Sequence, residues 1–357
     1  MQPTVTPAQP SRPTLPRGTV LGGTYEVRQH IGLGATSHVY RCRRLDDARE
    51  VAVKVLFADL AERQSARARF MREAWLAREL QHGNLVGAHE VFDLPDLAAY
   101  VMDYVRGPNL RRWAKQRGGA IHNEELFTIF FDVLAGLEHV HALGVIHRDL
   151  KPANILVDTA GPRPVARLID FGVARLVDER PDDEERSTIR GTPAYMSPDE
   201  LRSVDEVCPA SDLYSLGVIL YELACGARPF HDKTGEALWS AHLYEEPILP
   251  SRHNPNLHPA LEAVILKLLA KTPDARFGSV YGLRQALVAA LDLSAELERV
   301  PALLPDADDE QARREWLALV QVLMTTLMAF LLNPGASGRA DDPHYSNRAP
   351  DQLPLPV

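Results

Sequence analysis

This chain has 357 residues, 45% of them hydrophobic, which suffices for one sizeable domain with flanking segments and leaves no room for a second large domain. Its 39 basic and 48 acidic residues give a net charge of -9, so nonspecific nucleic-acid binding has no electrostatic support. The cysteines Cys42, Cys208 and Cys225 are odd in number and far apart, which argues against a disulfide framework or a zinc site and predicts a reducing, cytoplasmic environment.

The first part of the chain is rich in proline and then in strand-like runs. Residues 1–20 combine proline with Thr, Ser and Gln, and this composition has too little apolar surface to offset the entropy of ordering, so a disordered extension is expected. Strand-like alternation over 25–105, for instance at 51–54, is interrupted by one amphipathic helix expected over 66–80.

Helical periodicity dominates the second part of the chain. Between 106 and 293 the clearest helices are expected over 124–141, 211–225 and 259–271. The sequence therefore indicates a small strand-rich region followed by a larger helical one.

The C-terminal part contains an uncharged apolar run. A linker rich in acids and prolines occupies 294–315, the apolar run covers 316–332, and a polar tail covers 333–357. As a helix the run would be ~25 Å long, against roughly 30 Å of membrane hydrocarbon. Two interpretations remain. The run is either a single transmembrane helix or a helix packed on protein. As a transmembrane helix, it would have the preceding domain on the cytoplasmic side, because Arg313 and Arg314 precede it.

Two motifs carry groups suited to phosphoryl transfer. Residues 147–154 read His-Arg-Asp-Leu-Lys-Pro-Ala-Asn, and Asp-Phe-Gly follows at Asp170. Phosphoryl transfer needs one carboxylate to orient the attacking hydroxyl and further oxygen ligands for Mg²⁺. Asp149, Asn154 and Asp170 provide these groups at ordered spacing.

A glycine-rich loop and a charged pair lie upstream. Gly32 and Gly34 fall between two strand-like runs, where glycine lets backbone amides approach phosphate groups closely. Lys54 ends the strand Val-Ala-Val-Lys, and Glu73 lies on the expected helix, with Glu79 as its rival for the partner of Lys54. Together, the motifs resemble the catalytic domain of the protein kinase family, specifically bacterial serine/threonine kinases of the Hanks type.

The resemblance implies an α+β fold of two lobes, a small β-rich N-lobe over 25–105 with one helix and a larger, mainly helical C-lobe over 106–293. It also implies transfer of the γ-phosphate of ATP, with Mg²⁺ or Mn²⁺, to Ser or Thr of protein substrates in intracellular signalling. Autophosphorylation, with a dimer as one arrangement that allows it, belongs to the same expectation.

Specific roles are implied for matching residues. Asp149 resembles the catalytic base, Lys151 the residue that stabilises the transferred phosphoryl group, and Asn154 and Asp170 the metal ligands. Met102 would be the gatekeeper beside the hinge. The implied ATP-binding residues lie in the glycine-rich loop, the charged pair and the hinge, and they are Ile31, Gly32, Gly34, Val39, Ala52, Lys54, Glu73, Met102, Asp103, Val105 and Leu156.

Other matching residues have structural roles in the family. Thr192 is expected to pack near Asp149 and Lys151, and Asp212 to anchor the catalytic loop. Asp199 stands where the family has Glu, so its buried pair with Arg276 is expected to be looser.

Regulation by phosphorylation is implied by Arg148, which directly precedes the catalytic aspartate. In kinases with this pairing, a phosphate on the activation segment neutralises the arginine and orders the segment. Thr188 is the first candidate site and Ser187 the second, although the acids at 182–185 could partly satisfy Arg148 instead.

Two other functions compete with this interpretation. A pseudokinase scaffold would be expected to lack Lys54, Asp149 or Asp170, and all three are present. A small-molecule phosphotransferase would not be expected to carry the Gly-Thr-Pro-x-Tyr motif of 191–195.

Overall fold

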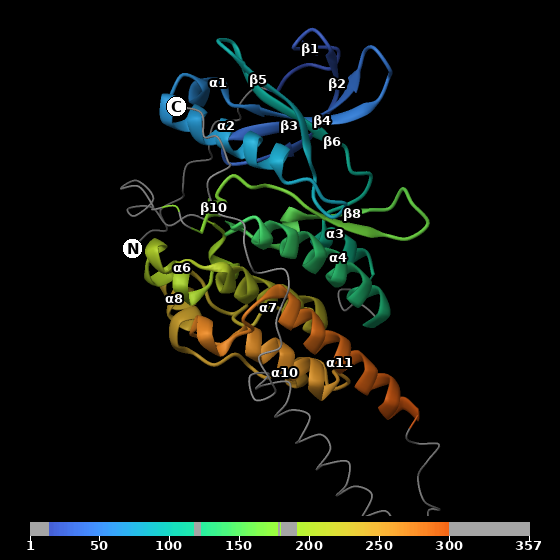
Figure 1. Ribbon diagram of the computed structural model, residues 1–357, viewed down its shortest axis with the longest axis vertical. Coiled ribbons are helices and arrows are strands. Elements are labelled where there is room, and N and C mark those ends of the chain that lie inside the picture. The colour runs from blue at the N-terminus through green and yellow to red at the C-terminus, as the bar shows by residue number, and fades with distance from the viewer. Residues whose placement is uncertain (1–13, 118–122, 178, 180–190, 300–357) are drawn as a thin grey trace, which may run out of the picture. The chain divides into compact units, whose positions relative to one another are not determined.

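The computed structural model describes residues 14–117, 123–177, 179 and 191–299. Contacts between residues divide the chain into a unit that ends at Asp292 and a second unit that begins at Leu293. The first unit has an upper lobe built on a sheet and a lower lobe built of helices (Figure 1).

The upper lobe is a six-stranded antiparallel sheet with the strand order β1-β2-β3-β4-β6-β5. Alternate side chains of its strands, such as Tyr40, Val53 and Val101, meet in a core on one face. The strands are β1 (Val20–Leu21), β2 (Tyr25–Leu33), β3 (Ser37–Arg44), β4 (Glu50–Leu56), β5 (Ala88–Leu94) and β6 (Leu97–Asp103).

Two helices accompany this sheet, α1 (Ala58–Ala61) and α2 (Gln64–Glu79). Phe70, Ala74 and Ala77 are buried on the face of α2 that packs against β5 and β6, which is the i, i+4, i+7 spacing of one helix face. The helix expected over 66–80 is therefore present, and its buried face explains the periodicity.

The lower lobe is mainly helical, with two small antiparallel sheets near its top. The helices are α3 (Leu110–Gln116), α4 (Asn123–Ala142), α6 (Pro198–Arg202), α7 (Pro209–Cys225), α8 (Gly235–Tyr244), α9 (Pro250–His253), α10 (Pro259–Leu268) and α11 (Val280–Arg299). The paired strands are β7 (Val145–Ile146) with β10 (Arg175–Leu176), and β8 (Ile155–Asp158) with β9 (Val165–Leu168). Short 3-10 turns cover Pro152–Asn154, Pro193–Tyr195, Val204–Glu206 and Pro273–Ala275.

Helix α7 is the centre of the lower lobe. It is buried on all sides from Ser211 to Tyr221, as expected for a helix that is apolar all round. A Cβ on Gly217 would lie 2.6 Å from Leu268 Cβ, so the glycine lets α10 approach α7 closely. Gly226 ends α7 with a left-handed φ of 74°.

Three expected boundaries need correction. The linker was expected to begin at residue 294, but α11 continues to Arg299, because the next proline comes only at Pro301 and the residues before it favour a helix. The disordered extension was expected to reach residue 20, but residues 14–20 are ordered because they bond to the sheet: the Leu15 amide donates to the Tyr40 hydroxyl at 3.0 Å, and the Gly18 amide donates to the Val27 carbonyl at 2.8 Å. The helix expected over 259–271 ends at Leu268, because Pro273 disfavours helical geometry just before it and a 3-10 turn follows.

No helix within the described ranges is long and apolar enough to cross a membrane. The apolar run 316–332, on which a membrane span was predicted, lies outside these ranges, as do the polar tail 333–357 and residues 1–13.

Candidate active site

Charged side chains from both lobes meet around Lys54, at the end region of β4. Its ammonium contacts Glu73 Oε1 of α2 and donates to Asp170 Oδ1 at 3.1 Å. The Tyr100 hydroxyl of β6 donates to the same Glu73 oxygen at 2.8 Å. Glu73, and not Glu79, is therefore the acid of α2 that meets Lys54.

The electrostatics of this cluster keep Lys54 and Asp170 charged. Burial lowers the pKa of Lys54, but the neighbouring carboxylates of Glu73 and Asp170 outweigh it and hold this pKa well above its usual value. Desolvation raises the pKa of Asp170, while the Lys54 ammonium lowers it, with a net fall to about 2. The site therefore contains an ammonium group that stays protonated beside a carboxylate that stays ionised.

The loop after β7 places Asp149 within a second polar cluster. Lys151 Nζ donates to Asp149 Oδ2 at 2.5 Å and to Thr192 Oγ1 at 2.8 Å. Thr192 in turn donates to Asp149 Oδ1 at 2.9 Å, and Asn154 Nδ2 donates to Asp149 Oδ2 at 3.0 Å. The four residues lie together, and the other three orient the carboxylate of Asp149.

Asp212, at the start of α7, holds this loop from below. Its carboxylate accepts hydrogen bonds from the backbone amides of His147 and Arg148, both at 2.9 Å, and contacts His141 Nε2 at 2.7 Å. Arg148 has a left-handed φ of 66°, which is strained for a residue with a side chain, and the bonds from Asp212 stabilise it. Burial raises the pKa of Asp212, but His141 outweighs it and the pKa falls below its usual range.

The segment that begins at Asp170 packs against the same loop. Phe171 is buried, and its ring centroid lies 5.0 Å from that of the buried His147, so this histidine packs in the interior. A Cβ on Gly172 would lie 3.0 Å from Glu73 Oε2 and 3.3 Å from Asp170 Oδ1, so a side chain at this position would crowd both carboxylates.

The expected nucleotide-binding residues lie on neighbouring strands of the upper lobe and on β8. Gly32 pairs with Val39 across β2 and β3, and Ala52 pairs with Met102 across β4 and β6. The Gly34 amide donates to the Ser37 carbonyl at 2.9 Å and closes the glycine-rich turn. Ile31 ends up near this turn, Asp103 and Val105 lie at and after the end of β6, and Leu156 lies in β8.

A hollow of about 370 Å³ lies next to the end of β6, lined by polar residues of both lobes that include Arg49, Asp103, Tyr104, Arg106 and Asp158. Lys54, Asp149 and Asp170 do not line it. This hollow is therefore separate from the charged clusters, and the geometry of those clusters locates the candidate site.

The donor set suits magnesium held together with a nucleotide. Among the described residues, no group of three or more His, Cys, Asp or Glu side chains is arranged to hold a metal ion. Asn154 and Asp170 offer one amide and one carboxylate oxygen donor, and Mg²⁺ is usually held by one or two carboxylates together with substrate phosphates. The residues present fit such an ion.

The buried pair Asp199–Arg276 is tighter than expected. Arg276 Nη1 donates to Asp199 Oδ2 at 2.6 Å and Nη2 donates to Oδ1 at 3.4 Å, and both side chains are almost completely buried. Ser211 also donates to Asp199 Oδ2 at 3.2 Å. The expectation of a looser pair was wrong, because the long Arg276 side chain reaches both oxygens and α6 holds Asp199 in its first turn.

The contacts that two tyrosines make in this part of the structure were not predicted from the sequence. Tyr100, which bonds to Glu73, lies two positions before Met102 in the same strand, so strand alternation placed both on one face and could have revealed it. Tyr195 accepts a hydrogen bond from Arg111 at 2.7 Å and donates to Glu222 at 2.5 Å. No local signal in the sequence marks this connection.

Glu200, in the first turn of α6, carries a buried carboxylate near the catalytic loop. The Ser197 amide and hydroxyl donate to Oε2 at 2.9 and 3.0 Å, whereas Oε1 is buried and accepts no hydrogen bond within the described residues. Burial raises the pKa of Glu200 to about 7; the Ser197 amide opposes the shift and Asp212 adds to it. A carboxyl whose pKa is raised on folding destabilises the fold as pH rises from the unfolded value, roughly 4.3, through 7.

We therefore expect Glu200→Gln to raise the melting temperature at pH 8 by a few degrees and to leave it nearly unchanged at pH 5. The amide keeps an acceptor for Ser197 but carries no buried charge at high pH. Calorimetry at both pH values measures the difference, with Glu206→Gln as a control on a neighbouring turn. An equal change at both pH values would contradict the assignment of a raised pKa to Glu200.

A small sheet lobe that holds a Lys-Glu-Asp charge cluster lies above a helical lobe that presents Asp, Lys and Asn from one loop. This arrangement provides the groups that phosphoryl transfer requires. The sequence profile of the protein kinase domain matches residues 25–288, and the chain belongs to this family. The resemblance and the α+β fold predicted from the motifs are confirmed.

Named relatives point to the bacterial serine/threonine branch. The chain is 36% identical over 277 residues to a probable serine/threonine-protein kinase of Streptomyces coelicolor, covering 76% of this chain and 40% of that protein. It is 35% identical over 292 residues to serine/threonine-protein kinase PknB of Mycobacterium leprae, covering 81% of this chain and 46% of the relative. For serine/threonine-protein kinase pkn3 of Myxococcus xanthus the identity is 35% over 284 residues, with 76% and 51% covered. The chain thus spans about half or less of the length of these relatives.

Proposed function

We propose that this chain is a serine/threonine protein kinase that transfers the γ-phosphate of ATP to Ser or Thr hydroxyls of protein substrates. The observation that carries the proposal is the Asp149 carboxylate, held by Lys151, Thr192 and Asn154 in the loop that Asp212 anchors. The serine/threonine specificity rests on the sequence Asp-Leu-Lys-Pro-Ala-Asn at 149–154, which resembles that of the serine/threonine branch, and on the names of the relatives.

In this proposal each residue of the site has a separate role in binding ATP or in transferring its phosphate. Lys54 binds the phosphates of ATP and is kept in place and charged by Glu73 and Asp170. Asp149 orients the substrate hydroxyl and accepts its proton while the oxygen bonds to the γ-phosphorus and the bond to ADP breaks. Lys151 neutralises the charge on the transferred group.

Asn154 and Asp170 would hold the divalent metal ion, which neutralises phosphate charge when bound. Mg²⁺ is the metal we propose, with Mn²⁺ as an alternative. The adenine and phosphates would be bound by the remaining strand and hinge residues, which are Ile31, Gly32, Gly34, Val39, Ala52, Met102, Asp103, Val105 and Leu156.

The test is incubation of the purified full chain with labelled ATP, Mg²⁺ and a generic protein substrate, followed by phosphosite mapping. Label in Ser and Thr that is absent from the Lys54→Met variant supports the proposal. ATP binding without transfer would instead indicate a scaffold, and transfer only to small molecules would indicate a different phosphotransferase. Label appearing in Lys54→Met chains mixed with wild type would support autophosphorylation between two chains.

Regulation through the activation segment is part of the proposal. The two candidate phosphosites, Thr188 and Ser187, and the acids at 182–185 lie outside the described residues. The same phosphosite map tests whether either site is modified, and Arg148 is the residue we propose to bind the phosphate.

We further propose that the run 316–332 anchors the chain in a membrane, with the kinase domain on the cytoplasmic side. The support is its lack of charge and its length in the sequence. The full chain is then expected in the membrane fraction, and deletion of residues 314–357 is expected to release an active kinase into the supernatant. A full chain that stays in the supernatant without detergent would mean that the run packs on protein.

A further inference from the structure

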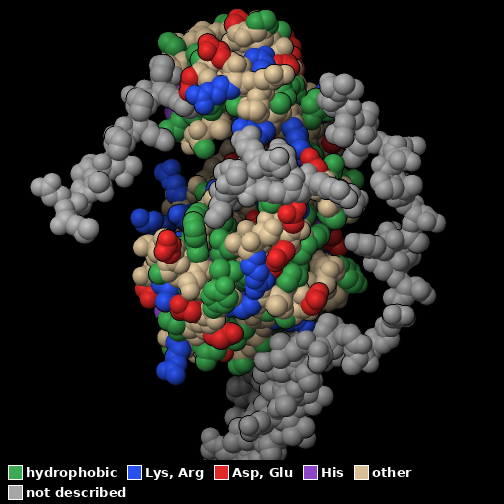
Figure 2. Space-filling view, turned by 90° about the vertical axis from the view of Figure 1, so that its left-hand side faces the viewer, with side chains coloured by type: hydrophobic (Ala, Val, Ile, Leu, Met, Phe, Trp, Pro, Cys, Tyr) green, Lys and Arg blue, Asp and Glu red, His purple; other side chains and the backbone are tan. Residues whose placement is uncertain are grey.

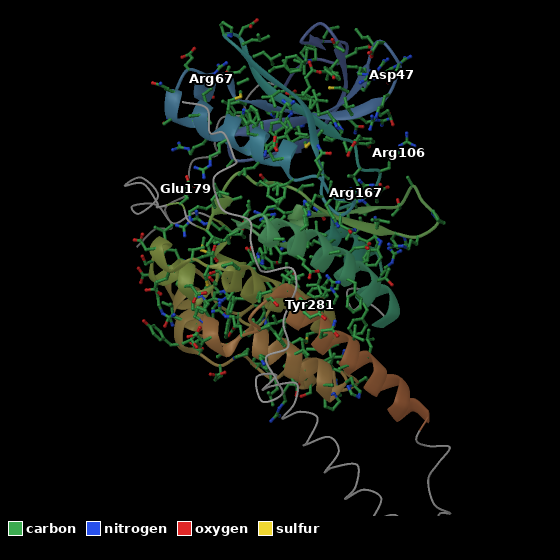
Figure 3. All side chains as sticks on the ribbon, viewed as in Figure 1. Asp47, Arg67, Arg106, Arg167, Glu179 and Tyr281 are labelled. Atoms are coloured by element: carbon green, nitrogen blue, oxygen red, sulfur yellow. The ribbon has the colours of Figure 1, made fainter. Side chains whose placement is uncertain are left out.

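An ion pair joins helix α2 to the segment that follows β10. The Arg72 guanidinium contacts Glu179 Oε2, and the two side chains are 45% and 30% exposed. Figure 3 places Glu179 below α2, where the upper lobe faces the lower. Figure 2 looks onto this side of the molecule and shows Lys and Arg side chains at the lower edge of the upper lobe. The pair therefore connects the two lobes outside the Lys54 cluster.

Arg72 lies next to Glu73 on α2, so a contact that holds Arg72 in place also holds the position of Glu73. The two residues are neighbours on α2 and their side chains lie about 100° apart around the helix axis. A rotation or outward shift of α2 that separates Glu73 from Lys54 would also pull Arg72 from Glu179. The ion pair and the Lys54–Glu73 contact therefore depend on the same position of the helix.

The opposite side of α2 contacts the sheet of the upper lobe, through residues other than Arg72. Phe70 packs on Tyr100 with ring centroids 5.4 Å apart, and Arg67 donates to Asp93 at 2.7 Å and to the Leu94 carbonyl at 2.5 Å. These contacts join α2 to the sheet of its own lobe. Arg72 ties the helix to Glu179, in the segment that follows β10.

We propose that Arg72 and Glu179 are positioning residues that hold α2 where Glu73 meets Lys54. A carboxylate encoded in the sequence then stabilises the active arrangement of the helix before any phosphate is added. This inference rests on the proposed kinase function, and it concerns how the site is assembled. Neither residue touches the reacting groups.

The expected size of the effect follows from the exposure of the pair. An exposed ion pair is a weak contact, and reversing one charge replaces it with a repulsion of similar strength. We expect Arg72→Glu and Glu179→Arg each to lower kcat/KM for ATP by roughly three- to ten-fold, mainly through KM for ATP because Lys54 is less well held. The KM for the protein substrate and the melting temperature should change little.

The experiment uses the full chain, treated with phosphatase so that no phosphate on the segment substitutes for Glu179. The double variant Arg72→Glu with Glu179→Arg restores the pair with reversed charges and is expected to return kcat/KM to within about two-fold of wild type. Arg78→Glu is the matched control, since it makes the same charge change on α2 at a guanidinium that lies over the Trp75 ring, 5.5 Å from its centroid. Its kcat/KM is expected to stay near that of wild type.

Hydrogen exchange of residues 64–79 provides a second readout that does not need activity. Faster exchange in both single variants and recovery in the double variant support the inference. Single variants that match wild type in exchange and in kcat/KM would overturn it, and so would a double variant as impaired as the two single changes combined. An inactive wild-type chain would overturn the proposed kinase function, while the exchange data would still decide the role of the ion pair.

Discussion

Replacing Asp149 with Asn is expected to lower kcat by about 10²- to 10⁴-fold, the range that a general base contributes. The amide has nearly the shape of the carboxylate, but it cannot accept the proton of the substrate hydroxyl. It also removes the negative charge that faces Lys151 at 2.5 Å. Initial rates with saturating ATP and protein substrate measure the effect.

Folding and ATP binding should survive this change. Asp149 is partly exposed, and the loop around it is held by Asp212 through the His147 and Arg148 amides. Asp158→Asn, at the end of β8 and 3.6 Å from Arg167, makes the same chemical change outside the Lys54 and Asp149 clusters and should retain the wild-type kcat. An Asp149→Asn chain with more than a tenth of wild-type kcat would remove this residue from the role of base.

Replacing Asp199 with Ala is expected to destabilise the fold by about 3–5 kcal/mol, because it leaves the Arg276 guanidinium buried without its carboxylate. Both side chains of this pair are at most 1% exposed. The melting temperature should fall by roughly 10 °C. Thermal unfolding followed by circular dichroism measures it.

The double variant Asp199→Ala with Arg276→Met separates the loss of the pair from the burial of an unpaired charge. It should be less destabilised than Asp199→Ala alone, since no buried cation remains. Asp274→Ala, at an exposed acid next to Arg276, is the control and should change the melting temperature little. If Asp199→Ala were no more harmful than this control, the pair would not be important for stability.

The sequence indicated the family and the candidate site residues because these residues lie in short local motifs. Residues 147–154 form one loop and one 3-10 turn, so Asp149, Lys151 and Asn154 are already close to one another in the chain. Helix α2 could be recognised from the period of its buried residues, and Glu73 followed from its place on that helix.

Local sequence patterns gave wrong predictions where the structure depends on contacts between residues that are distant in the chain. Residues 14–20 read as disordered from their composition, but hydrogen bonds to Tyr40 and Val27 order them. The shorter acid Asp199 suggested a loose pair. Its distance to Arg276 depends on how α6 packs against α7 and on where the turn at Pro273–Ala275 places Arg276, and these make the pair close.

What the sequence determined by itself was the set of candidate reacting groups, since the residue types that the proposed phosphoryl transfer requires are visible in the chain. Only the tertiary structure decided how these groups are held. Tyr100 reaches Glu73 across 27 positions, His147 and Arg148 rest on Asp212 across more than 60, and Arg72 meets Glu179 across 107. Such contacts form when separate elements pack, and the free energy of that packing is distributed over the whole core and cannot be read from any one segment.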